Sequence, residues 1–152
     1  MGTWVLKSFI ELTTEELYDI LALRAEIFVV EQNCPYQDPD GKDKKAMHMY
    51  YKEGDTIISY VRILPAGVSY QEPSIGRFVV KASERRKGYG RVIFTRAIDY
   101  ITTFWKADAI RISGQAYLRN FYESLGFVVQ KDGYLEDGIP HFEMLRTTKK
   151  TS

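Results

Sequence analysis

The chain has 152 residues, enough for a single domain with a sizeable hydrophobic core. Hydrophobic residues make up 45% and charged residues 27%, and no apolar run reaches membrane-spanning length, so a globular protein is expected. The net charge of +1 argues against general nucleic-acid binding, and a single cysteine excludes an intramolecular disulfide. A lone cysteine and the absence of a signal-peptide pattern predict a cytoplasmic location.

The first half of the chain predicts a strand, a helical region and a hairpin. A strand is expected at residues 4–9, and Thr13 with Glu16 has the spacing of a capping box at a helix start. Helical spacing then continues to Phe28, with a division into two short helices expected before Gln32. A polar loop follows, and the runs at 49–52 and 56–64 predict a hairpin.

The second half alternates strands and helices. These elements are predicted at residues 75–80 (strand), 93–104 (helix), 109–113 (strand), 118–125 (helix), 127–130 (strand) and 141–145 (strand). The order predicts an α/β (α+β) fold with a mixed, mostly antiparallel central sheet flanked by helices on both faces. We expect one domain over residues 1–146 and a disordered tail at 147–152.

A basic, glycine-punctuated turn joins the strand at 75–80 to the following helix. It consists of Arg85, Arg86, Lys87, Gly88, Tyr89, Gly90 and Arg91. Free N–H groups and the dipole at a helix start favour an anion, and glycines let the backbone approach it closely. The turn has neither the Gly-Lys-Ser/Thr of a Walker loop nor the third glycine of a dinucleotide fingerprint. It indicates a phosphate-containing ligand, with a charged loop before a helix as the alternative.

Two strings in this order resemble the GCN5-related N-acetyltransferase (GNAT) superfamily: residues 85–90 after a strand, and residues 120–127 on a later helix. Residues 28–36, His48 and residues 137–141 are similar to the ElaA-like bacterial acyltransferases within it. The resemblance covers about residues 4–146. It implies the acyl-CoA N-acyltransferase fold, acetyl-CoA as cosubstrate, and direct transfer of the acetyl group to a primary amine.

The resemblance also assigns roles to single residues. Backbone groups of Phe78, Val79 and Val80 would pair with the pantetheine arm of the cofactor, and the turn at 85–91 would hold its pyrophosphate. Gln115, at a position that is often Asn in the family, and Asn120 would complete the cofactor site.

Tyr122 matches the family tyrosine that protonates the leaving thiolate. A positioned phenol suits this step because the sulfur gains negative charge as the amine attacks. From spacing alone, simple packing with Leu118, Phe121 and Leu125 is the alternative.

The acceptor amine needs a proton acceptor, because an alkyl ammonium has a pKa of about 10.4. Glu31, His48 and His141 are the candidates, with Glu31 preferred and a structural role as the alternative for each. Cys34 lacks an adjacent base and is interpreted as a packed thiol rather than a nucleophile. One further group could attract a cationic acceptor or form solvated turns, namely Asp38, Asp40, Asp43, Glu136 and Asp137.

No metal site is expected, because two histidines and one cysteine show no ligand spacing. The expected partner is a small-molecule or peptide amine, without nucleic acid or membrane, and a homodimer is compatible with the sequence. Two rival functions are a non-catalytic acyl-CoA-binding regulatory module and an RNA- or nucleotide-binding domain that uses the basic turn.

Overall fold

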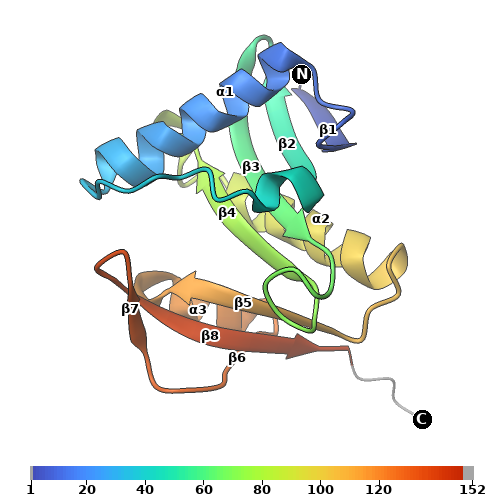
Figure 1. Ribbon diagram of the computed structural model, residues 1–152, viewed down its shortest axis with the longest axis vertical. Helices are drawn as coiled ribbons and strands as arrows, with labels where there is room; N and C mark the ends of the chain where they lie inside the picture. Colours follow the sequence, from blue (N-terminus) through green and yellow to red (C-terminus); the bar gives the residue numbers. More distant parts are fainter. Residues whose placement is uncertain (1, 149–152) are drawn as a thin grey trace.

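The computed structural model describes residues 2–148, which form two antiparallel sheets (Figure 1). The first sheet has the order β1-β2-β3-β4, with β1 (Gly2–Ser8), β2 (Met47–Glu53), β3 (Thr56–Leu64) and β4 (Ser74–Val80). In the second sheet β8 (Ile139–Thr147) pairs with β5 (Ala109–Gln115), β6 (Val128–Val129) and β7 (Tyr134–Glu136).

Helices cover both faces of the first sheet. The helix α1 (Thr14–Ala25) packs on β3 and β4, and α2 (Tyr89–Thr103) packs on the opposite face, against β2, β3 and β4. The short helix α3 (Arg119–Ser124) lies against β5 of the second sheet. This arrangement confirms the predicted fold class. No helix among residues 2–148 combines the length and the apolar character needed to cross a bilayer.

The start of α1 is the predicted capping box, but its end differs from the prediction. The Glu16 N–H donates to Thr13 Oγ1 (3.0 Å), and the Thr13 N–H donates to Glu16 Oε1 (2.9 Å). Instead of dividing into two helices, α1 continues directly into a π-helical turn, Glu26–Glu31. The prediction of a break was wrong because Glu26 keeps right-handed helical angles, which lets Ile27 and Phe28 extend the buried stripe of α1.

The two sheets meet at one end and separate at the other. The Arg111 N–H in β5 donates to the carbonyl oxygen of Pro73, directly before β4 (3.0 Å). From this bond β4 and β5 run in the same direction and diverge (Figure 1). Within residues 2–148 no ladder joins them, so β4 has an open hydrogen-bonding edge that faces β5.

A β-bulge in β4 was not predicted. Arg62 pairs with Gly76 but Tyr60 pairs with Val79, so two residues of β4 oppose Val61 alone. Arg77 sits in this bulge with φ of +47°, a left-handed conformation that is uncommon for a residue with a side chain. The bulge turns Arg77 toward the loop after α1, where its Nε lies 2.8 Å from Asp38 Oδ1.

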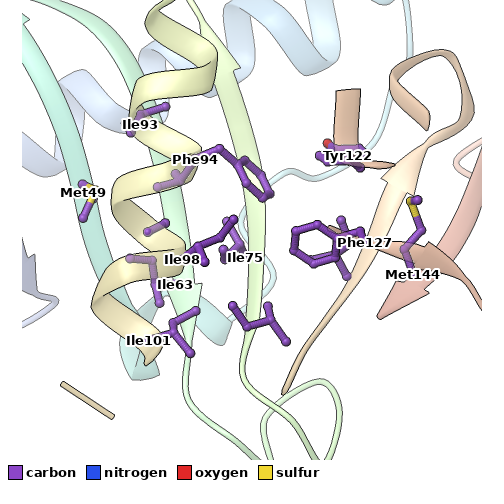
Figure 2. Packing of buried hydrophobic residues seen from close by; sticks show 14 residues of the cluster. Met49, Ile63, Ile75, Ile93, Phe94, Ile98, Ile101, Tyr122, Phe127 and Met144 are labelled. Carbon is purple, nitrogen blue, oxygen red and sulfur yellow. The ribbon is translucent and has the colours of Figure 1, made fainter. Parts of the chain in front are cut away.

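One core holds the two sheets together. In Figure 2, Phe94 and Ile98 of α2 lie beside Ile75 of β4, and Phe127 and Met144 approach from the side of the second sheet. A smaller cluster lies between α1 and the other face of the first sheet. Because the larger cluster includes residues of both sheets, they pack as one unit around the divergent strands.

The C-terminal part is more strand-rich than predicted. The strand β8 extends two residues beyond the predicted 141–145 at each end, and the three-residue β7 was missed. The end of β8 includes Thr147, where the predicted tail began, and residues 149–152 lie outside the described residues. Asp137 and Gly138 connect β7 and β8, both with positive φ, as a tight hairpin turn requires.

Candidate active site

A cavity of about 640 Å³ fills the space between the diverging strands. Every residue of β4 lines it, including Phe78, Val79 and Val80, and Ile112, Ser113 and Gln115 of β5 line the other side. The π-helical turn after α1, the loop that follows this turn and the β7–β8 hairpin also contribute to the wall. An extended chain that enters here can therefore hydrogen-bond to the open edge of β4.

The glycine turn forms a second cavity of about 330 Å³ at the start of α2. Its wall includes Arg85, Arg86, Gly88, Tyr89, Gly90 and Arg91, as predicted for an anion site. Gly88 (φ +87°) precedes the helix and no side chain caps its first turn, so N–H groups there are available to a ligand. Lys87 instead pairs with Glu84 at 2.5 Å and is not part of the wall.

The two cavities share wall residues, Val80 and Arg85. The Arg85 Nε donates to the Val80 carbonyl oxygen (3.3 Å), which fixes the guanidinium at the end of β4. One ligand can therefore extend from the glycine turn along β4 into the larger cavity.

Tyr122 belongs to the core cluster (Figure 2). It also lines the larger cavity. Its side chain packs against Phe94, Phe121 and Phe127, and only 5% of the residue is exposed. Burial raises the pKa of its hydroxyl above the ordinary value, so the phenol stays protonated. The hydroxyl has no hydrogen-bond partner among residues 2–148, which leaves it available as a donor to a ligand.

The lack of a side chain at Gly114 of β5 leaves room for the Tyr122 ring. A Cβ atom at position 114 would lie 2.5 Å from Cε2 of that ring, closer than packed carbon atoms approach. The absence of a side chain at Gly114 is thus what allows Tyr122 to lie against the strand.

Of the three predicted proton acceptors, Glu31, His48 and His141, it is His141 that lines the cavity. Its Nδ1 lies 2.7 Å from the carbonyl oxygen of Ile139. Because a carbonyl oxygen only accepts, Nδ1 is the nitrogen that carries the proton in the neutral ring, which leaves the lone pair of that form on Nε2. Nε2 lies 3.5 Å from Glu136 Oε2, a carboxylate that would stabilise the ring once it is protonated.

Tyr122 and His141 reach the cavity from opposite faces of the second sheet. The Tyr122 ring lies on the side to which a Gly114 side chain would point. Gln115 points the other way, because neighbouring residues in a strand alternate, and His141 is its register partner on β8. The cavity therefore continues around the edge of β5 from one face to the other.

Glu31, the preferred proton acceptor from the sequence, is engaged elsewhere. Its carboxylate accepts two hydrogen bonds from the Arg85 guanidinium, at 3.0 and 2.6 Å, and it lines neither cavity. The hydrogen bonds to Glu31 raise the pKa of Arg85. The geometry thus places Glu31 as a partner of the glycine turn.

His48 has a structural position. It is fully buried, with Nδ1 2.7 Å from the Tyr60 hydroxyl and Nε2 2.8 Å from the Asp43 carbonyl oxygen, and it lines neither cavity. Burial lowers its pKa. This corrects the sequence-based expectation of a proton relay, because both ring nitrogens are engaged away from the cavity.

The remaining predicted residues divide between the cavity and the surface. Gln115 lines the cavity and exchanges amide hydrogen bonds with Gln32 (3.2 and 3.4 Å). Asn120 is exposed and lines neither cavity, so the structure gives it no place in the cofactor site. Cys34 lies beside the cavity, with Sγ 3.0 Å from the Asp137 carbonyl oxygen.

Sequence reasoning missed three arginines. Arg24, Arg62 and Arg77 pair with the aspartates that were expected to attract a cation or to form solvated turns, at Asp38, Asp40 and Asp43. Arg24 and Arg62 occupy positions on otherwise apolar faces of α1 and β3, and this was the available signal. Residues 2–148 contain no group of three His, Cys, Asp or Glu side chains arranged to hold a metal ion.

Comparison with known proteins agrees with this geometry. The sequence matches the family described as "Acetyltransferase (GNAT) domain" over residues 19–148. It is 38% identical to Protein ElaA of Escherichia coli K12 over 138 residues, which is 90% of either chain.

Solved structures show the same relationship. The crystal structure of an acyl-CoA N-acyltransferase from Pseudomonas aeruginosa superposes with a TM-score of 0.91 at 36% identity, covering 97% of this chain and 100% of the other. The crystal structure of Escherichia coli ElaA gives a TM-score of 0.90 at 36% identity, with 96% and 99% coverage. The chain belongs to the GNAT acetyltransferase family and, within it, to the ElaA-like subgroup.

Proposed function

We propose that the protein transfers the acetyl group of acetyl-CoA directly to a primary amine. The observation that carries this proposal is the connected cavity that leads from the glycine turn, along the open edge of β4, to Tyr122 and His141. Membership of the GNAT family supports acyl transfer as the reaction class.

The acetyl donor, acetyl-CoA, suits the residues that line the two connected cavities. N–H groups at the start of α2, with Arg86 and Arg91, would bind the pyrophosphate of acetyl-CoA. The backbone of residues 78–80 would pair with the amide groups of the pantetheine arm, which brings the thioester toward Tyr122. Much of the rate enhancement would come from holding the thioester and the amine together.

Proton transfer is divided between the two faces of the sheet. His141 Nε2 accepts a proton from the acceptor ammonium, and Glu136 stabilises the resulting imidazolium. The amine nitrogen then bonds to the thioester carbonyl carbon, the carbon–sulfur bond breaks, and Tyr122 donates a proton to the sulfur. The ammonium nitrogen loses two protons on becoming an amide: His141 passes the first to solvent, and the second replaces the proton that Tyr122 gave to the sulfur of CoA.

The test is CoA release from acetyl-CoA with a panel of amines, together with the affinity for acetyl-CoA. Tyr122→Phe and His141→Gln should each lower kcat by about 100-fold or more while acetyl-CoA affinity is retained. His48→Gln serves as a comparison, because its effect should appear in thermal stability and not in the pH dependence of kcat.

The rival is a non-catalytic module that binds acyl-CoA. Acetyl-CoA binding without turnover of any amine would favour that module and contradict the proposal. Turnover that persists in Tyr122→Phe with an unchanged kcat would contradict the assigned role of Tyr122 alone.

A further inference from the structure

The charged groups in and behind the part of the cavity wall that β3, the start of β4 and the loop after the π-helical turn form are mostly neutralised by one another. Arg62 Nη1 lies 2.7 Å from Asp40 Oδ1, Arg24 Nη1 lies 2.7 Å from Asp43 Oδ1, and Arg77 pairs with Asp38. Three guanidinium groups thus balance three carboxylates. A ligand in the cavity meets a wall here with little net charge.

Lys42 also lies in this wall, but no carboxylate among residues 2–148 neutralises its charge. It lines the cavity, and its backbone N–H donates to Asp40 Oδ1 (3.0 Å), which anchors the residue. Its Nζ donates to Ser69 Oγ (2.8 Å) but pairs with no carboxylate within the described part of the chain. The positive charge of the ammonium group is therefore not balanced by a carboxylate within the described residues, and the group has unused donors.

A carboxylate lines the same cavity. Glu136 and Tyr70, the residue after Ser69, both belong to its wall, and burial, followed by the charges of Tyr134, Glu143 and Glu136, raises the pKa of Tyr70 to about 12. Glu136 also accepts a hydrogen bond from Ser113 (3.3 Å) and faces His141. Lys42 and Glu136 thus present opposite charges on the wall of the same cavity.

The part of the cavity at Lys42 is far from the phosphate-binding turn. Ser69 belongs to the loop between Leu64 and Ser74, which pair at the start of β4, whereas Arg85 is bound to Val80 at its end. At about 3.3 Å per residue, β4 separates the two positions by about 20 Å. An anion at Lys42 would therefore belong to the acceptor and not to the pyrophosphate of CoA.

We infer that the acceptor is an amine that also carries an anionic group, a carboxylate or a phosphate, and that Lys42 and Ser69 bind this group. The inference rests on the proposed function. The acceptor nitrogen faces His141 and Glu136, while the anionic group accepts hydrogen bonds from Lys42 Nζ and the Ser69 hydroxyl. Amino acids, peptides with a free carboxylate and amino phosphates belong to this class, whereas polyamines would be repelled by Lys42.

The test compares acceptors that differ only in the anionic group. Glycylglycine is paired with glycylglycinamide, and O-phosphoethanolamine is paired with ethanolamine, with spermidine as a polycation. The anionic member of at least one pair should have a kcat/KM at least tenfold higher, and the pair that shows the difference identifies carboxylate or phosphate.

Variants of Lys42 test whether this residue causes the preference for the anionic acceptor. Lys42→Met should raise KM for the preferred anionic acceptor about tenfold or more and so abolish the discrimination within its pair, because a charged hydrogen bond is lost. Lys42→Arg should restore it in part, and Lys44→Met, an exposed neighbour in the same turn, should behave as the wild type.

The outcomes separate this inference from the proposed function. Equal kcat/KM within both pairs, or an equal loss for both members in Lys42→Met, would overturn the inference and leave acetyl transfer intact. Acetyl-CoA binding without turnover of any amine would overturn the proposed function, and the inference with it.

Discussion

Gly114 controls where the hydroxyl of Tyr122 points, since the ring occupies the space of a missing side chain. Gly114→Ala should therefore displace the phenol and lower kcat by up to about 100-fold, because small displacements of reacting groups are costly. The KM for acetyl-CoA should change little, since the glycine turn and β4 are untouched. Steady-state kinetics with acetyl-CoA varied at a saturating amine checks this.

A double variant shows whether Gly114 acts through Tyr122. In the Tyr122→Phe background, Gly114→Ala should cost little further activity, because the two changes remove the same contribution. Losses that multiply would instead indicate that Gly114 affects another part of the site.

At the scale of single residues, candidates in short sequence motifs could be predicted. The role of a residue that depends on contacts with distant parts of the chain could not. Tyr122 and the turn at 85–91 could be singled out from short motifs, although the place of the Tyr122 ring also depends on Gly114 of β5. His48 stands in an equally suggestive string, but its bonds to Tyr60 and Asp43 depend on how a distant loop packs. Its exclusion from the cavity could not be inferred before the fold was known.

Glu16 links α1 to the first sheet and makes the stability of that link depend on pH. It accepts hydrogen bonds from the Thr13 N–H, the Tyr50 hydroxyl and Lys7. Burial raises its pKa, but these partners outweigh burial and lower the pKa to about 2. The stabilisation is therefore complete above the ordinary value of 4.5 and is lost as the pH falls toward 2.

Glu16→Gln should lower the free energy of unfolding by about 1–3 kcal/mol at pH 7. The difference from the wild type should shrink between pH 4.5 and 2, as measured by urea denaturation at several pH values. Glu15→Gln, an exposed neighbour in the same turn, is the control. A difference that stays constant over this pH range would contradict the assignment.

The loop after α1 is held by buried ion pairs, and Arg24 is fully buried among them. Arg24→Met should destabilise the protein by about 3–5 kcal/mol, because Asp38 and Asp43 would keep buried charges without this partner. Arg119→Met, which removes an exposed pair with Glu123, should cost less than about 1 kcal/mol. Equal losses in thermal denaturation would show that the network contributes no more than a surface pair.

Element boundaries were predictable where a local signal exists. The capping box at Thr13 and the hairpin of β2 and β3 follow from residues adjacent in sequence. The bulge at Arg77 has no such signal, because it depends on the register between β3 and β4 and on the aspartates that Arg77 reaches. The π-helical turn after α1 has no such local signal either, and its Ile27 and Phe28 pack into the core cluster beneath α1.

For the whole molecule, the cavity between the diverging strands β4 and β5 has walls from both sheets, and the proposed function puts acetyl-CoA in it. Acetyl-CoA at about 100 times its dissociation constant should therefore raise the free energy of unfolding by about 2.7 kcal/mol. Thermal denaturation with and without ligand measures this, and Tyr122→Phe should show the same shift as the wild type. An unchanged melting temperature at saturating acetyl-CoA would contradict binding between the sheets.

The position of Tyr122 and His141 on opposite faces of the second sheet has a kinetic consequence. Two substrates that enter from different sides do not obstruct one another, so either can bind first and both must be present before chemistry. Initial rates with both substrates varied should give intersecting double-reciprocal lines, and CoA should compete with acetyl-CoA but not with the amine. Parallel lines would instead reveal an acyl-enzyme and direct attention to Cys34, whose sulfur lies beside the Asp137 carbonyl at the rim of the same cavity.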